Sequence, residues 1–307
     1  MNWYVIALAP AVAFAAALAF YPVRRKGGRG RTWAWLACCA VVALSPCLVP
    51  LDAKPVRFVA SLTAITMLVK LYDVYVECGL AQHSSLHSYL AYLPNGFWLV
   101  LRKEPSRVPL VRDLRRLRWA VPALLVLMLL GVALWRQDWS AAPFAVEHAL
   151  KVSLVILTVV LIANALAAAY RLRGGRALDF MNNPIAARTP ADFWRRWNRP
   201  AQQFLSEYIF MPAGGLRRPV RATLVTFGMS GLIHEYVFGI AAGRVQGWQI
   251  LFFIVQGCAV VATAHTRPTG WTQSLWIAAT AVFNLSTSVL FFQSVDAVLP
   301  FYWPRSP

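Results

Sequence analysis

The sequence predicts an all-α, polytopic membrane protein with about eight transmembrane helices and an amphipathic helix on the cytoplasmic side. Three observations support this prediction: 59% of the 307 residues are apolar, only 14% are charged, and the mean hydropathy is +0.53. An average soluble domain has about 45–50% apolar and about 25% charged residues. The same composition excludes a disordered chain, a collagen-like chain, a coiled coil and a small disulfide-stabilised scaffold.

Eight apolar stretches have about the length that a helix needs to cross the hydrocarbon layer, which is about 20 residues. The first, within residues 1–23, carries no charged side chain and lacks the basic start of a signal peptide, so we expect a membrane helix. The other seven are expected at 32–50, 58–76, 119–135, 152–170, 222–242, 248–264 and 271–293. Residues 88–101 are apolar but short and are interrupted by Pro94-Asn95-Gly96, which predicts a re-entrant or interfacial segment.

The basic residues predict the orientation of these helices. With eight crossings, 23 of the 30 Lys and Arg residues lie on the same side as the loop at 23–31, and six lie on the other side. Because Lys and Arg accumulate in cytoplasmic loops, we place that side in the cytoplasm and both termini away from it. The same bias accounts for the net charge of +18 without a nucleic-acid partner. Frequent Arg and Ala favour a bacterial source, and hence the bacterial cytoplasmic membrane.

Residues 1–307 are expected to form one membrane-embedded domain, because no repeat, low-complexity segment or separate soluble region is evident. In the first long cytoplasmic loop, residues 102–119 predict a basic helix that lies on anionic lipid. Lys70, Asp73 and Glu77 share one face of the third span, where an ion pair within the bundle is favoured over a tunnel lining. The five cysteines lack the spacing of metal ligands, so no metal site is expected.

The second long cytoplasmic loop predicts an amphipathic helix at the membrane surface. Thr189, Pro190 and Asp192 have the pattern of a helix start: a capping hydroxyl, a proline at the first position and a carboxylate in the first turn. Aromatic residues then recur at near-helical spacing, and Pro200 is expected to bend or interrupt the helix. Taken alone, this pattern favours a structural interfacial helix with arginines reaching lipid phosphates.

The span at 222–242 places His234 and Glu235 about halfway across the bilayer. A charged side chain at this depth costs about 2.5–3.5 kcal/mol on insertion scales, so an ionisable residue there usually faces a cavity or a pathway. Neighbouring residues of a helix point about 100° apart, so one can serve chemistry while the other binds a buried partner. We favour His234 for proton transfer, because the unperturbed pKa of imidazole is about 6.5.

Two segments, RTPADFWRRWN at 188–198 and SGLIHEY at 230–236, resemble the membrane-bound O-acyltransferase family. The resemblance covers residues 178–242 and pairs an aromatic-rich cytoplasmic helix ending in Trp-Asn with a downstream intramembrane histidine. The WN and HEY elements resemble the wax synthase, sterol and diacylglycerol acyltransferase branches, and the short chain with about eight spans is most similar to wax synthase-like members. DFWRRW and EYIFMPAGG instead resemble the bacterial polysaccharide O-acetyltransferase branch.

The resemblance implies transfer of an acyl group from acyl-CoA to a hydroxyl, with a long-chain alcohol as the favoured acceptor. His234 would take the hydroxyl proton, and Asn198 would stabilise the tetrahedral intermediate or position the substrates. The implied acyl-CoA-binding residues are Trp194, Arg195, Arg196, Trp197 and Arg199, and the implied supporting residues are Asp192, Glu235 and Tyr236. The scheme needs no cofactor or metal. Its partners are acyl-CoA, a lipid-soluble alcohol and membrane lipids, and the sequence assigns no oligomeric state.

Two alternatives remain open from the sequence. An O-acetyltransferase that acts on a polysaccharide or a small metabolite would use the same chemistry with acetyl-CoA. A proton-coupled transporter would use His234, Glu235 and the charged face of the third span as a proton path. Transporters often have repeated halves, which this sequence lacks, and Trp197-Asn198 would have no role in one.

Overall fold

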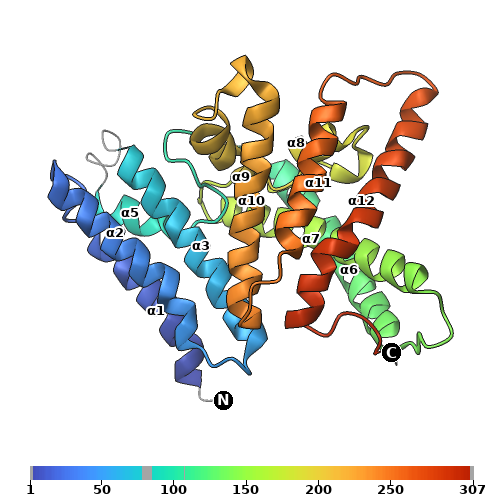
Figure 1. Ribbon diagram of the computed structural model, residues 1–307, viewed down its shortest axis with the longest axis horizontal. Helices are drawn as coiled ribbons and strands as arrows, with labels where there is room; N and C mark the ends of the chain where they lie inside the picture. Colours follow the sequence, from blue (N-terminus) through green and yellow to red (C-terminus); the bar gives the residue numbers. More distant parts are fainter. Residues whose placement is uncertain (1–2, 78–84, 107, 305–307) are drawn as a thin grey trace.

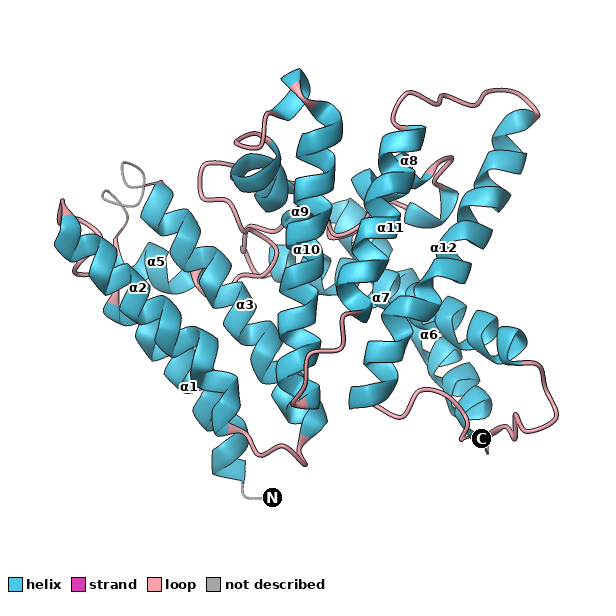
Figure 2. Cartoon of the chain, in the orientation of Figure 1, coloured by secondary structure: helices cyan, strands magenta, loops and turns pink. Residues whose placement is uncertain are grey.

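The computed structural model describes residues 3–77, 85–106 and 108–304, and within these ranges the chain forms helices and loops without strands (Figures 1 and 2). Cys78 lies outside these ranges. The eight longer helices are α1 (Trp3–Ala19), α2 (Arg29–Leu44), α3 (Lys54–Val76), α6 (Leu110–Arg136), α7 (Phe144–Leu172), α10 (Pro219–Ala242), α11 (Trp248–Thr263) and α12 (Thr272–Val298). Each overlaps one of the eight expected spans, which confirms the all-α membrane fold.

Six of these helices are long and apolar enough to cross a membrane. They are α2 together with the 3-10 turn Ser45–Leu48, and α3, α6, α7, α10 and α12; α1 and α11 are shorter apolar helices. The chain is therefore an integral membrane protein. Both termini lie at the same edge of the molecule (Figure 1), as an even number of crossings requires.

Helix α10 occupies the middle of the molecule and packs against both α3 and α11, while α6 and α7 form a separate pair (Figure 1). Two glycines permit the close packing of α10 and α11. A Cβ at Gly231 would lie 3.1 Å from the Cα of Ile250, and one at Gly257 would lie 2.8 Å from the Cβ of Phe227. Small residues let membrane helices approach in this way.

The shorter elements lie in the two long loops. They are α5 (Leu86–Tyr92), the 3-10 helices Pro184–Ala186 and Gly215–Arg217, α8 (Pro190–Arg196), α9 (Arg199–Leu205) and a π-helical turn, Ser206–Phe210. Within residues 88–101, α5 is followed by turns, and Tyr89 and Tyr92 are buried in the protein core. This segment does not form a ninth span, which agrees with the prediction from the sequence.

The basic segment at 102–119 does not form a separate helix on the lipid surface, so that prediction was wrong. From Leu110 onward it is the first part of the continuous helix α6. Ion pairs with α7 and its following loop hold this end: Arg171 pairs with Asp113 at 2.6 Å, and Arg116 pairs with Asp179 at 2.6 Å. These partners are distant in the sequence, so the helical pattern alone did not reveal them.

The charged face of α3 binds other segments of the bundle: Glu77 forms an ion pair with Arg102 at 3.2 Å, whereas Lys70 and Asp73 form hydrogen bonds. Lys70 donates to the carbonyl of Trp98. Asp73 accepts hydrogen bonds from the hydroxyls of Tyr92 and Tyr208, each at 2.6 Å. These bonds fix the loop after α5 and the turn after α9 against the core, beside the cavity described next.

Candidate active site

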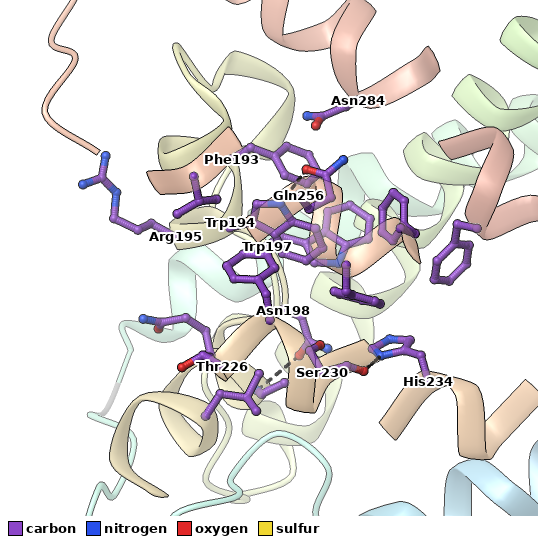
Figure 3. A pocket seen from close by; sticks show the side chains of 18 of the residues that line it. Phe193, Trp194, Arg195, Trp197, Asn198, Thr226, Ser230, His234, Gln256 and Asn284 are labelled. Carbon is purple, nitrogen blue, oxygen red and sulfur yellow. Dashed lines mark hydrogen bonds between the residues drawn. The ribbon is translucent and has the colours of Figure 1, made fainter. Parts of the chain in front are cut away.

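A cavity of about 590 Å³ lies between the long helices α7, α10, α11 and α12 and the short helices α8 and α9 (Figure 3). Most of the side chains that line it are apolar or aromatic. The polar lining residues include Asn198, Thr226, Ser230, His234, Gln256 and Asn284. The size and lining are typical of a site for a largely apolar small molecule that a few polar groups orient.

His234 of α10 lines this cavity, and its imidazole has a defined orientation (Figure 3). Nδ1 lies 2.8 Å from the carbonyl oxygen of Ser230. A carbonyl can only accept, so Nδ1 carries a hydrogen, and in the neutral imidazole the free lone pair is then on Nε2. The ring of Phe253 packs 4.4 Å from the imidazole, measured between ring centroids. His234 is therefore held in a form that can accept a proton at Nε2.

Asn198 lines the same cavity from the turn between α8 and α9. Its backbone is in the left-handed region, with φ 40° and ψ 62°, which asparagine tolerates better than most residues. The side-chain Oδ1 accepts a hydrogen bond from the backbone N–H of Ala201 at 3.3 Å. Nδ2 has no hydrogen-bond partner among the described residues, so its N–H groups remain available to a bound molecule.

Residues 180–182 hold the turn that contains Asn198. The backbone N–H of Arg199 donates to the carbonyl of Phe180, and the N–H of Asn182 donates to the carbonyl of Arg196, each at 2.9 Å. The amide of Asn164 on α7 binds both the N–H and the carbonyl of Met181, at 3.0 and 3.1 Å. Helix α7 therefore positions Asn198 through this segment.

The helix break lies earlier than the sequence predicted. Thr189 caps α8 by accepting a hydrogen bond from the backbone N–H of Asp192 at 3.1 Å, as its pattern predicted. The chain leaves the helical conformation at Trp197 and Asn198, whereas Pro200 lies in the first turn of α9. Proline is well tolerated there because the first helical N–H groups have no partner within the helix.

Three residues of α8 and its end line the cavity beside Asn198: Trp194, Arg195 and Trp197. The indole Nε1 of Trp194 donates to Gln256 Oε1 at 2.9 Å, and Gln256 Nε2 donates to Thr287 at 2.8 Å. The Arg195 side chain is 53% exposed and lies 3.7 Å from Asp192. It is therefore a cation at the edge of the cavity, accessible to solvent.

Asp192, Arg196 and Arg199 are not among the cavity-lining residues. The Arg196 Nε donates to Asp192 at 3.0 Å, and the backbone N–H of Arg188 donates to the same carboxylate at 3.1 Å. Burial disfavours the ionised carboxylate, but these bonds and the nearby arginine charges outweigh it and lower the pKa of Asp192. Asp192 stabilises the start of α8.

Glu235 and Tyr236 point away from the cavity and bind neighbouring segments. Glu235 is buried, and its carboxylate accepts backbone N–H groups of Gln246, Gly247 and Gln249, at 2.5, 2.8 and 3.3 Å. These bonds provide acceptors for backbone N–H groups at the start of α11, which have no partner within the helix. Tyr236 donates its hydroxyl to the carbonyl of Ala43 at 2.7 Å.

Several polar residues that were not assigned to the site from the sequence also line the cavity, among them Thr226, Ser230, Gln256 and Asn284. The Oδ1 atom of Asn284 is buried and has no hydrogen-bond partner among the described residues. Their position inside strongly apolar spans was the available signal, because such residues usually bond between helices or face a pathway. No cluster of three or more His, Cys, Asp or Glu suited to a metal ion occurs in the described ranges.

Comparison with known proteins identifies a family model and several relatives. The model of the MBOAT, membrane-bound O-acyltransferase family, matches residues 116–294. "Probable long-chain-alcohol O-fatty-acyltransferase 9" of Arabidopsis thaliana is 31% identical over 116 residues, which is 34% of each chain. "Probable long-chain-alcohol O-fatty-acyltransferase 1" of the same plant is 26% identical over 189 residues, covering 56% of this chain and 54% of the relative.

A third relative is "Diacylglycerol O-acyltransferase 1-1" of Oryza sativa subsp. japonica. It is 28% identical over 91 residues, which is 29% of this chain and 17% of the relative. The matches therefore span between about a sixth and about half of the length of these three relatives. The family match includes every residue from α8 to α11, and so contains both His234 and Asn198.

Proposed function

Because the chain belongs to the membrane-bound O-acyltransferase family, we propose that it transfers an acyl group from acyl-CoA to the hydroxyl of a long-chain alcohol. One observation carries this proposal: His234 and Asn198 line the same apolar cavity. The imidazole offers a proton acceptor and the carboxamide offers hydrogen-bond donors, which are the two groups that acyl transfer to a hydroxyl requires.

In the proposed reaction, Nε2 of His234 removes the hydroxyl proton while the alcohol oxygen attacks the thioester carbonyl carbon. The carbonyl oxygen becomes negatively charged in the tetrahedral intermediate, and the Nδ2 N–H groups of Asn198 stabilise it. The intermediate then expels the CoA thiolate, which takes the proton back from His234. The products are an ester and free CoA, and the imidazole returns to its starting form.

Arg195 is the cavity-lining residue best suited to the polar part of acyl-CoA. A guanidinium binds phosphate through paired N–H groups, and the side chain of Arg195 is exposed at the cavity edge. Arg196 has Asp192 as its partner, so we assign it to the structure of α8. We place this edge on the cytoplasmic side, with both termini on the other side of a bacterial membrane.

The cavity lining favours a lipophilic acceptor over a sugar. Trp194, Trp197, Phe252, Phe253 and Phe291 present aromatic surface to the interior. A sugar has many hydroxyls, and each would need a partner to offset its lost hydration. A linear alkyl chain has no such requirement, so burial in this cavity stabilises it.

The experiment that tests the proposal compares donors and acceptors with the purified protein in lipid nanodiscs. Acetyl-CoA, octanoyl-CoA and palmitoyl-CoA are each supplied with a long-chain alcohol, a sterol, a diacylglycerol or a sugar, and the ester is quantified by mass spectrometry. The proposal predicts the highest kcat/KM with a long-chain donor and the long-chain alcohol. A preference for acetyl-CoA with the sugar would contradict it and favour the O-acetyltransferase alternative. The absence of ester from every pair would also contradict it.

A further inference from the structure

One end of the cavity lies toward the side of the molecule where the two termini lie. Along α10 its lining runs from Thr223 to His234, and along α12 it runs from Asn284 to Phe292. Both helices run toward that side, so His234 and Phe292 are the deepest lining residues of their helices. Val155 and Ile156 of α7 also line the cavity, and we call the part that they line the arm.

Three phenylalanines, which we call the aromatic floor, lie at this end: Phe252, Phe291 and Phe292. The rings of Phe252 and Phe291 are 5.4 Å apart between centroids, and those of Phe291 and Phe292 are 5.7 Å apart. These separations are within the range of favourable aromatic pairs. The floor is therefore a packed layer of rings.

Residues 299–304, which we call the C-terminal strap, lie behind the aromatic floor. Phe301 of the strap packs against Phe292, with ring centroids 4.5 Å apart, and both belong to one buried cluster with Val152 of α7. Phe301 is not a cavity-lining residue. The ring of Phe292 therefore separates the arm of the cavity from the strap.

Buried polar groups of α7 fasten the strap. Lys151 donates to the carbonyl of Phe301 at 2.9 Å, and the backbone N–H of Trp303 donates to Glu147 at 2.6 Å. His148 Nε2 lies 2.9 Å from the carbonyl of Leu285, so it donates there, and Nδ1 accepts from the Tyr302 hydroxyl at 2.7 Å.

The end of α12 supplies a further attachment for the strap. Asp296 accepts the backbone N–H groups of Phe301 and Tyr302, at 2.7 and 2.9 Å. Hydrogen bonds to a carboxylate are among the stronger ones in proteins. The strap is therefore fixed to two helices, and Phe301 supports Phe292 from a rigid position.

We propose that Phe292, supported from behind by Phe301, closes the deep end of the cavity and sets the longest alkyl chain that the protein accepts. This inference rests on the proposed function, since an alkyl chain must enter the cavity for its end to matter. The chain is either the acyl chain of the donor or the alkyl chain of the alcohol. A close-packed wall excludes an added methylene unless side chains move, which gives the chain-length limit its physical basis.

The test measures kcat/KM in two series, one varying the acyl-CoA with a fixed alcohol and one varying the alcohol with a fixed donor. In the wild type, kcat/KM is expected to fall by about tenfold or more for each methylene beyond the optimum. In one of the two series, Phe292→Ala should shift the decrease in kcat/KM to longer chains. The series that shifts identifies whether the acyl chain or the alcohol chain occupies the arm. Ile156→Phe, which adds a ring to the wall of the arm, should move the fall to shorter chains in the same series.

Phe301→Ala tests the support from the strap. It should shift the limit in the same direction as Phe292→Ala, and the double variant should show less than the sum of the two shifts, because the residues are in contact. Phe20→Ala is the matched control, since Phe20 is fully buried in a cluster that is formed by other helices. It should lower thermal stability and leave both chain-length profiles unchanged.

The outcomes separate this inference from the proposed function. If the wild type forms no ester from any pair, the proposed function is wrong. If the wild type is active and neither Phe292→Ala nor Ile156→Phe moves the limit in either series, the inference about the closed end is wrong. Where Phe292→Ala does not fold, Phe292→Leu and Ile156→Phe decide the question.

Discussion

Asn198 combines three requirements that few other residues meet. Its backbone has φ 40°, its Oδ1 caps the start of α9, and its Nδ2 remains available to the cavity. Glycine would satisfy the backbone and aspartate would satisfy the cap, but only asparagine also supplies N–H donors. The resemblance to the acyltransferase family implied a role for Asn198, and the geometry shows why this residue type fits the turn.

Replacing Asn198 with glycine distinguishes the role of its side-chain amide from the role of its backbone conformation. Asn198→Gly retains the left-handed conformation and removes the amide, so kcat should fall by about 10²–10³-fold, the usual loss when an oxyanion donor is removed. KM for acyl-CoA should change much less. Steady-state kinetics on the purified variant measure both constants. A wild-type kcat in Asn198→Gly would remove the amide from the reaction.

Glu235 illustrates the opposite case, in which a residue beside the proposed base serves the structure. Glu235→Gln replaces one carboxylate oxygen with a donor that faces backbone N–H groups, so stability should fall by about 1–3 kcal/mol. The ester-forming rate per folded molecule should remain close to the wild-type rate. Thermal unfolding and kinetics on one preparation measure the two effects. Unchanged stability with a large loss of kcat would instead assign Glu235 to the chemistry.

Among the secondary-structure elements, the sequence predicted the apolar helices well. It predicted poorly where the helices begin and end and how the segments between them are held. A span is a local property, because its composition alone decides whether lipid accepts it. The helix break at Trp197 depends on residues 180–182 and on Asn164, which approach only in the folded chain. The start of α6 likewise depends on ion pairs with α7 and with the loop after it. The partners are distant in the sequence, so no local pattern reveals them.

Asp179 connects two helices, since it pairs with Arg112 and Arg116 of α6 and with Arg171 of α7. Burial disfavours its ionised form, but the hydrogen bond from Arg116 and the three arginine charges outweigh burial and lower its pKa. A lowered pKa stabilises the fold above the pKa of the unfolded chain, about 3.9, and this contribution is lost as pH falls through the folded-state pKa.

Asp179→Asn should therefore lower the melting temperature at pH 7, and the difference from the wild type should shrink as the pH falls below about 4. Thermal melts in nanodiscs across this pH range measure the difference. Asp52→Asn, at an exposed carboxylate in the loop before α3, is the control and should leave the melting temperature unchanged. A difference between Asp179→Asn and wild type that does not vary with pH would contradict this assignment.

For the whole molecule, the sequence predicted the eight long helices, the family of the protein, and that His234 and Asn198 would line one cavity. It did not predict the C-terminal strap, because residues 299–304 have no helical period and their bonds go to α7, about 150 positions earlier. The charge distribution also predicts an orientation. That prediction concerns the membrane, so it needs a measurement on cells.

Cysteine labelling tests the orientation directly. In a background with all native cysteines replaced by serine, Ser140→Cys lies between α6 and α7, and Leu216→Cys lies before α10; both positions are exposed. A membrane-impermeant maleimide should label Ser140→Cys in intact cells, and should label Leu216→Cys only after permeabilisation. The reverse pattern would invert the topology and place Arg195 on the side away from cytoplasmic acyl-CoA.

In the proposed reaction, His234 removes the proton of an alcohol in this cavity. The most direct measurement is the release of CoA thiol from palmitoyl-CoA, with and without a long-chain alcohol, by the wild type, His234→Ala and the control His265→Ala. We expect alcohol-dependent release by the wild type and by His265→Ala, whose histidine is exposed in the loop after α11, and a loss of about 10²–10⁴-fold or more in His234→Ala. Alcohol-dependent release at the wild-type rate by folded His234→Ala would contradict the proposed reaction.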